Sequence, residues 1–255
     1  MIGTLAFGFA ATLALAACVW AVSLPLHDAS IVDIAWGWLV MTPAFVASAV
    51  VPSTGPRTFA VIALGAMWAL RLSGYIAWRH HGHGEDRRYR AIRDRNQPNF
   101  GIKSLLFVFA LQAVLATVVA LPVVGAIASP APWNMVDAVG VALVVAGFAF
   151  EAVGDAQLAR FKSDPSHAGR VMDQGLWKYS RHPNYFGECC LWWGLWLIAA
   201  AAGAWWTIVS PLLMTVLLLK VSGVTLLEQD LRERRPAYRD YIRRTNAFVP
   251  GNPRP

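Results

Sequence analysis

The chain has 255 residues, of which 56% are hydrophobic and only 15% are charged, and its formal net charge is +7. A soluble domain of this length carries more charge on its surface, so the composition excludes an ordinary soluble protein and is typical of membrane helices. The excess of positive charge does not indicate a nucleic-acid partner, because basic residues concentrate in the cytoplasmic loops of membrane proteins.

Seven apolar runs follow one another along the chain, and a membrane crossing takes about 20 apolar residues. No Lys or Arg precedes the first run, so we expect it to be a permanent helix and not a signal peptide. No repeat or linker interrupts the pattern. We therefore predict an all-α, polytopic membrane protein, with a seven-transmembrane-helix bundle forming a single domain over residues 1–255. The runs are residues 2–24, 34–51, 58–78, 104–128, 135–153, 186–203 and 205–222.

The basic residues predict how the bundle is oriented. Residues 79–103, 158–185 and 220–255 hold 20 of the 22 Lys and Arg residues. A chain that crosses the membrane alternately places these three segments on one face, and loops rich in positive charge face the cytoplasm. We therefore predict an N-terminus outside and a C-terminus in the cytoplasm. In a bacterium, the protein would be a multi-pass protein of the inner membrane.

Polar side chains inside apolar runs are costly, and each one indicates a possible function. The predicted orientation places all of them in or just beneath the cytoplasmic half of the bilayer. Two structural alternatives stay open. Asp33 could cap the second helix, and Arg71 could extend to the interface or pair with an acid of the fifth helix. The polar residues are Asp33, Arg71, Glu151, Asp155, Asn184 and Glu188.

The density of arginine beside these polar groups favours an anionic cofactor with several phosphates, because guanidinium groups bind phosphate oxygens bidentately. No G-x-G-x-x-G motif is present, so a nucleotide would have to bind inside the helical bundle. His80, His81 and His83 resemble a metal cluster, but they lie among arginines without helical spacing. We predict no metal site.

Residues 175–188 form the most specific motif, Gly-Leu-Trp-Lys-Tyr-Ser-Arg-His-Pro-Asn-Tyr-Phe-Gly-Glu. Pro183 suits the first turn of a helix. The motif therefore gathers Arg181, His182 and Asn184 at a helix N-terminus, a position that favours anions.

This motif and the tail from Tyr238 to Pro250, Tyr-Arg-Asp-Tyr-Ile-Arg-Arg-Thr-Asn-Ala-Phe-Val-Pro, resemble the C-terminal part of the steroid 5-alpha-reductase family. Asp33-Ile-Ala-Trp36-Gly37, Arg71-Leu-Ser-Gly-Tyr75 and the loop Glu85-Asp-Arg-Arg-Tyr-Arg90 resemble its bacterial branch. The resemblance covers nearly the whole chain. It implies a seven-helix reductase that binds NADPH and transfers a hydride to the C=C bond of an α,β-unsaturated ketone, typically a 3-oxo-Δ4 steroid or a similar lipid.

The resemblance also implies roles for individual residues. Hormone-reducing members carry a Gln-Glu pair in the second helix, where this chain offers only Asp33, and a Tyr where this chain has Trp68. Asp33 with Tyr75 or Tyr185 is expected to take over the polarisation of the ketone. The expected catalytic residues are Asp33, Tyr75 and Glu188. The expected cofactor-binding residues are Trp36, Arg71, Asp155, Arg170, Tyr179, Arg181, His182, Asn184, Tyr185, Tyr238, Tyr241, Arg244 and Asn246.

Two other functions stay open. Membrane methyltransferases of the isoprenylcysteine or phospholipid type carry a similar Arg-His-Pro-x-Tyr-x-Gly loop, and they bind S-adenosylmethionine, which has no phosphate. A non-catalytic transporter or lipid-binding protein is the other alternative. The partners expected for the reductase are a hydrophobic small molecule and membrane lipids, with no obligate protein partner.

Overall fold

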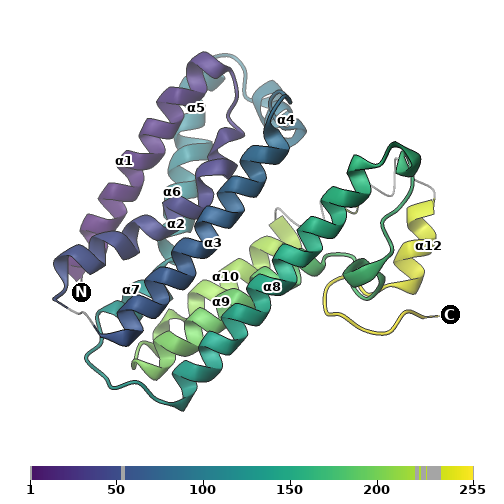
Figure 1. The fold of residues 1–255 in the computed structure, drawn as a ribbon. Coiled ribbons are helices and arrows are strands. Elements are labelled where there is room, and N and C mark those ends of the chain that lie inside the picture. Colours follow the sequence, from purple (N-terminus) through teal and green to yellow (C-terminus); the bar gives the residue numbers. More distant parts are fainter. Residues whose placement is uncertain (1, 53–54, 222–223, 225–227, 229–236, 255) are drawn as a thin grey trace. The chain divides into compact units, whose positions relative to one another are not determined.

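The computed structural model describes residues 2–52, 55–221, 224, 228 and 237–254, and in them every regular element is a helix (Figure 1). The chain divides into two compact units. The first unit is Met1–Asp137 with Ile198–Ser210, and the second is Ala138–Leu197 with Pro211–Pro255. The single domain expected over residues 1–255 stays a prediction. Two parts of the predictions lie outside the described residues. They are the end of the last predicted run, Ser222, and three arginines of the basic tail, Arg232, Arg234 and Arg235.

The first unit is built on three long helices, α1 (Ile2–Leu26), α2 (Ile31–Val50) and α3 (Pro56–His80), with α2 packed against both α1 and α3. A nearly continuous helical segment follows and contacts α1 and α2. It consists of α5 (Phe100–Ser104), the π-helical η1 (Leu105–Ala110), α6 (Leu111–Val119) and α7 (Leu121–Ile127). A Cβ at Gly37 would lie 2.8 Å from the Cα of Ala69, so glycine permits the close approach of α2 to α3.

The second unit is centred on α8 (Met135–Ser163) and α9 (Pro183–Ala201), whose backbones touch at glycines. A Cβ at Gly187 would lie 2.5 Å from the backbone N of Glu151, and one at Gly194 would lie 2.7 Å from the O of Gly140. Small residues allow membrane helices to pack closely in this way. The other elements of this unit are η2 (Pro165–His167), η3 (Gly175–Lys178), most of α10 (Val209–Val216), η5 (Leu217–Val221) and α12 (Ala237–Arg244), whereas η4 (Trp205–Ile208) belongs to the first unit.

Five helices among the described residues are long and apolar enough to cross a membrane, and they are α1, α2, α3, Phe100–Val119 and α8. The last two predicted runs correspond to α9 and to the shorter apolar segment Trp205–Val221. These helices confirm the expectation of a multi-pass membrane protein. The count of seven crossings and the orientation of the termini stay predictions.

The loops of the first unit meet at two opposite ends of its long helices. At one end, His80 Nε2 lies 2.7 Å from Asp28 Oδ2, which joins the end of α3 to the α1–α2 loop. At the other end, Arg57 binds Asp137 through two bonds of 2.7 Å, and Arg57 is 4% exposed. Within the first unit, the α1–α2 loop and the end of α3 therefore share one end, and the start of α3 and the start of α8 share the other. The basic loop after α3 shares its end with the α1–α2 loop, while Arg57 is neutralised by a buried acid.

Candidate functional site

Asp33 lies in the first turn of α2, and two side chains of α4 (Arg87–Arg95) hold its carboxylate. Arg88 Nη2 donates to Asp33 Oδ2 at 2.9 Å, and Tyr89 Oη donates to Asp33 Oδ1 at 2.6 Å. The N-cap position of α2 belongs to Ser30. The alternative that Asp33 caps this helix is therefore wrong, and its carboxylate is engaged with another element.

Tyr89 is 7% exposed and lies on a helix that is otherwise mostly charged. Burial first, and then the negative charge of Asp33, raise the pKa of Tyr89, so its phenol stays protonated. Burial alone would lower the pKa of Arg88, but the nearby carboxylates of Asp33 and Asp86 raise it. The cluster of Asp33, Arg88 and Tyr89, called the Asp33 cluster below, thus combines a compensated carboxylate with a neutral hydrogen-bond donor.

The sequence did not single out Arg88 and Tyr89, because spacing gave no reason to place α4 against the start of α2. The one available signal is that Tyr89 is the only aromatic side chain in the charged stretch Arg87–Arg95. The sequence suggested Tyr75 or Tyr185 as the partner of Asp33, but the tyrosine bonded to Asp33 is Tyr89, in the loop from Glu85 to Arg90.

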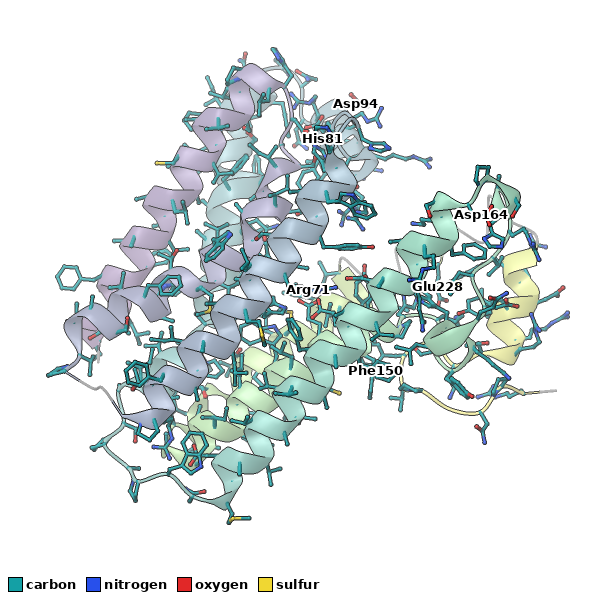
Figure 2. All side chains as sticks on the ribbon, viewed as in Figure 1. Arg71, His81, Asp94, Phe150, Asp164 and Glu228 are labelled. Carbon is teal, nitrogen blue, oxygen red and sulfur yellow. The ribbon has the colours of Figure 1, made fainter. Side chains whose placement is uncertain are left out.

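Arg71 and Tyr75 lie one turn apart on α3, with the Arg71 Cζ 5.5 Å from the centre of the Tyr75 ring. A second guanidinium, that of Arg79, lies 5.9 Å from the same ring. Trp36 on α2 is half-buried. Arg71 belongs to the first unit and Glu151 and Asp155 to the second, so the ion pair between them that the sequence left open stays untested. Figure 2 labels Arg71 on α3.

In the second unit, the structure brings together two of the predicted cofactor residues. Asn184 Nδ2 donates to Asp155 Oδ1 at 2.9 Å, joining the first turn of α9 to α8. The other amide atom, Asn184 Oδ1, is buried and accepts no hydrogen bond from a described residue. Glu188 follows one turn later on α9 and is 7% exposed. The helix pair α8 and α9 thus holds one buried hydrogen-bond acceptor, Asn184 Oδ1, that a ligand N–H group can satisfy.

Arg181 and His182 bind Glu228, a residue that the sequence did not single out. Arg181 Nε and Nη2 donate to the Glu228 carboxylate at 2.7 and 3.1 Å, and His182 Nε2 lies 3.2 Å from Glu228 Oε1. Burial alone would raise the pKa of Glu228, but hydrogen bonds with His182 and Arg181 lower it to about 2. The ring of His182 also stacks on Tyr185. Glu228 is labelled in Figure 2.

The same guanidinium holds the C-terminal tail. Arg181 Nη1 donates to the carbonyl oxygens of Ile242 and Thr245. The backbone N–H of Arg181 also donates to the carbonyl oxygen of Asn246 at 2.9 Å. All three guanidinium nitrogens of Arg181 are therefore used within the protein. Its expected contact with a cofactor stays a prediction, but the structure shows that it fastens the tail. We refer to Arg181, His182 and Glu228 as the Glu228 cluster.

The predicted tail residues pack on the loop before α9. Tyr241 Oη donates to the carbonyl oxygens of Trp177 and Ser180 at 2.5 and 3.3 Å, and burial raises the pKa of Tyr241. The ring of Tyr238 packs on that of Tyr241. Arg244 Nη2 lies 3.3 Å from Asp173 Oδ2. Two loop residues, Arg170 and Tyr179, are exposed, so they could contact a ligand at the surface of this unit.

A model of the family described as "Protein of unknown function (DUF1295)" matches residues 19–245, which is most of the chain. Neither a curated protein nor a solved structure matches the chain significantly. This family is related to steroid 5-alpha-reductase-like membrane proteins. The matched range includes both clusters described above, and the chain therefore belongs to the DUF1295 family.

Proposed function

We propose that the protein is an NADPH-dependent membrane oxidoreductase that reduces the C=C bond of an α,β-unsaturated ketone, such as a 3-oxo-Δ4 steroid or a similar lipid. The observation that carries this proposal is the hydrogen bond of 2.6 Å between the buried phenol of Tyr89 and Asp33. Hydride addition to an enone places negative charge on the carbonyl oxygen, and a hydrogen-bond donor beside that oxygen stabilises it. A methyl transfer does not need a phenol kept in its neutral form.

The cofactor residues fit NADPH in two respects. Asn184 Oδ1 is a buried acceptor that a carboxamide N–H group can satisfy. Exposed cations of the same unit, including Arg170 and Lys178, suit phosphate oxygens. Asn184, Asp155 and these cations would hold the cofactor. When bound, NADPH supplies a hydride to the β-carbon of the enone, which leaves negative charge on the carbonyl oxygen of the substrate.

Tyr89 would stabilise that charge. Its single O–H is given to Asp33 in this structure, and a carbonyl oxygen that gains negative charge competes for the same hydrogen. Arg88 Nη2 continues to compensate the Asp33 carboxylate when the phenol turns away. Tyr89 keeps its proton and donates a hydrogen bond to the enolate oxygen. The α-carbon then takes a proton from water, which gives the saturated ketone, and water can reach the cluster because the Arg88 side chain is 42% exposed. Asp33 and Tyr89 thus act as a polarising pair.

One observation favours the alternative, an S-adenosylmethionine-dependent methyltransferase. All three guanidinium nitrogens of Arg181 in the most specific motif donate hydrogen bonds within the protein, so its fork is not available to bind a phosphate bidentately. S-adenosylmethionine has no phosphate and would not need one.

Ligand-induced stabilisation separates the two functions, because a ligand that binds only the folded state raises its stability. We expect the purified protein in nanodiscs to unfold at a higher temperature with NADPH than without it. Asn184→Ala should reduce that increase, and the exposed Asp94→Asn serves as a control on the other unit. An increase with S-adenosylmethionine and none with NADPH would assign the site to a methyltransferase.

We also propose that the chain crosses the membrane seven times, with the N-terminus outside and the C-terminus in the cytoplasm. The grouping of the loops at two ends of the first unit supports this topology, since the end with the larger share of Lys and Arg residues is expected to face the cytoplasm. A reporter that is active only in the cytoplasm should work when fused after Pro255. Activity of a periplasmic reporter at this position would contradict the topology.

A further inference from the structure

A pocket of about 310 Å³ in the first unit lies apart from the Asp33 cluster. It lies between the end of α1 and the start of α5. Polar side chains form much of its wall, with Phe100 and Ala29 beneath them. The polar lining residues that carry the argument are His27, Arg93, Gln97 and Asn99.

The depth of this pocket in the membrane follows from the helices that form it. The apolar span of α1 ends at Leu26, and the span that begins α5 starts at Phe100. Both spans therefore end at the pocket, which is the level of lipid headgroups. Large apolar side chains continue from the pocket along both helices and are more than half exposed, as with Leu26, Ile102 and Leu106.

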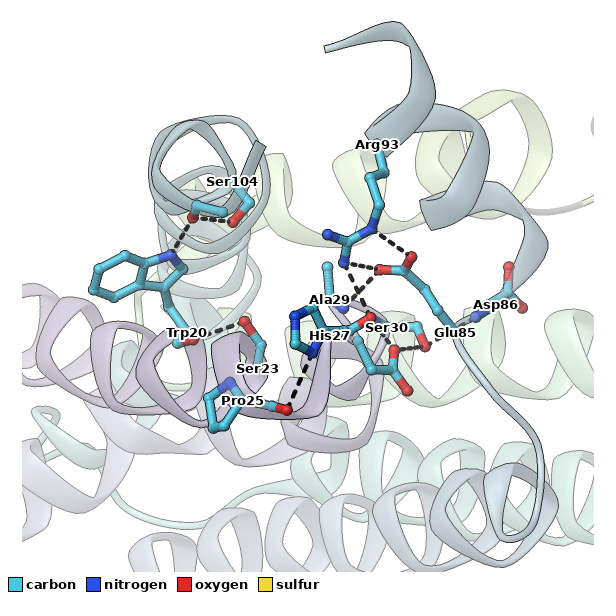
Figure 3. Close-up of polar contacts among 12 residues, drawn as sticks. Trp20, Ser23, Pro25, His27, Ala29, Ser30, Glu85, Asp86, Arg93 and Ser104 are labelled. Atoms are coloured by element: carbon cyan, nitrogen blue, oxygen red, sulfur yellow. Dashed lines mark hydrogen bonds and ion pairs between the residues drawn. The ribbon is translucent and has the colours of Figure 1, made fainter. Parts of the chain in front are cut away.

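The charges around the pocket are arranged to bind an anion. Two acids lie beside the lining residues, and both are already bound within the protein. Both oxygens of Glu85 accept from Arg93 and one also accepts from the Ala29 N–H, while Asp28 is bound to Ser30 and His80. The Cζ atom of Arg93 lies 4.6 Å from the centre of the Phe100 ring, and this stacking fixes the guanidinium beside the pocket. Arg93 Nη1 makes no hydrogen bond to a described residue. Figure 3 shows Arg93 bonded to Glu85 and to the backbone of His27.

The wider segment strengthens this attraction. Residues 79–103 hold seven Lys or Arg residues against three acids. Lys103 donates to the carbonyl oxygen of Asn96, the residue before the pocket-lining Gln97. Gln97 and Asn99 are exposed amides at the rim, so they can donate hydrogen bonds to hydroxyl and ester oxygens. Basic pockets beside membrane helices are suited to the headgroups of anionic lipids.

We propose that this pocket binds the phosphate-bearing headgroup of an anionic phospholipid. Arg93 Nη1 and the His27 ring contact the phosphate, the amides of Gln97 and Asn99 contact the glycerol oxygens, and the acyl chains lie along the exposed apolar faces of α1 and α5. This site is independent of the proposed reductase activity, because no residue of the Asp33 cluster lines it.

Native mass spectrometry after exchange into nanodiscs of phosphatidylglycerol and phosphatidylcholine tests the proposal. We expect one phosphatidylglycerol molecule to be retained in preference to phosphatidylcholine. Gln97→Glu places a carboxylate at the rim, which should reduce retention by roughly tenfold or more because two negative charges then face each other in a partly enclosed site. Arg95→Gln is the matched control, since it lowers the net charge equally two residues away but does not line the pocket.

Two results would overturn the proposal. Equal losses in Gln97→Glu and Arg95→Gln would mean a diffuse attraction to the basic loop and no pocket-bound lipid. Displacement of the lipid by glycerol 3-phosphate or inorganic phosphate at comparable concentration would assign the pocket to a soluble phosphate. Asn99→Asp repeats the test at a second rim position, where an aspartate tolerates the left-handed backbone conformation (φ 65°).

Discussion

The Asp33 cluster and the Glu228 cluster use the same chemistry to different ends. In each, a carboxylate lies beside an arginine and a ring-bearing side chain, Tyr89 in one and His182 in the other. In the Glu228 cluster, the arginine and the carboxylate are each 8% exposed, and the arginine also binds two backbone carbonyls. In the Asp33 cluster, Arg88 is 42% exposed and Asp33 is 26% exposed.

A buried ion pair with several further hydrogen bonds fixes structure, whereas a half-exposed pair can exchange partners. Removing one member of a buried pair leaves an uncompensated charge, and the cost is large. An exposed pair contributes little to stability. We therefore expect substitutions in the Glu228 cluster to affect folding, and substitutions in the Asp33 cluster to affect turnover.

The largest expected effect is on stability. Arg181→Leu should lower the free energy of unfolding by about 3–5 kcal/mol, because it leaves the Glu228 carboxylate buried without its main partner. Denaturant unfolding in detergent measures this change, and limited proteolysis of the tail gives a second readout. A loss below about 1 kcal/mol would remove the distinction between the clusters, since it would equal the contribution of an exposed pair.

The next effect is on catalysis. Tyr89→Phe keeps the ring but removes the hydroxyl, so kcat and kcat/KM should fall together by roughly 10²–10³. Asp33→Asn should cause a similar loss, because it no longer holds the phenol as a carboxylate does. Asp94→Asn makes the same chemical change at an exposed position of α4 and should keep full turnover. A Tyr89→Phe variant that turns over as fast as the wild type would leave the cluster a structural role only.

The third effect depends on pH. The pKa of Glu228 is lowered from 4.5 to about 2 in the folded state. Because the pKa of Glu228 is lower in the folded state than in the unfolded state, its ionised form stabilises the fold at any pH above the unfolded pKa. This contribution, on the order of 3 kcal/mol, is lost as pH falls from about 5 through about 2. The wild type should thus be more stable than Glu228→Gln near neutral pH, and the difference should shrink on acidification. A difference that stays constant over this range would contradict the ion pair.

The ion pair between Arg88 and Asp33 should contribute least to stability. Arg88→Gln should change the free energy of unfolding by less than about 1 kcal/mol, since the ion pair it breaks is partly exposed. The same denaturant experiment as for Arg181→Leu measures it. If both variants lost equal stability, the Asp33 cluster would be as structural as the Glu228 cluster.

The helices could be predicted from the sequence because each apolar run must satisfy its backbone internally in a membrane. The start of α2 was predicted at residue 34, but the helix begins at Ile31. Asp33 interrupts the apolar pattern there, while its carboxylate is compensated by Arg88 and Tyr89 more than 50 residues later. No local pattern contains such a contact.

The candidate site was predicted only in part, for a chemical reason. The contact between Asn184 and Asp155 joins two residues that the sequence had selected. Arg181 was selected for a phosphate, but a guanidinium fork fits a carboxylate equally well, and the partner in this structure is Glu228. Sequence alone could not decide between these two anions, since Glu228 lies 47 residues away.

Product analysis decides whether the Asp33 cluster serves the reduction of an enone by NADPH. The protein in nanodiscs is incubated with a 3-oxo-Δ4 steroid and NADPH that carries deuterium at the transferable position. We predict that NADPH is consumed in step with formation of the saturated ketone, that deuterium is found at the β-carbon, and that Tyr89→Phe slows both. Absence of reduced product for this steroid and for simpler enone lipids, together with methyl transfer from S-adenosylmethionine, would contradict the account.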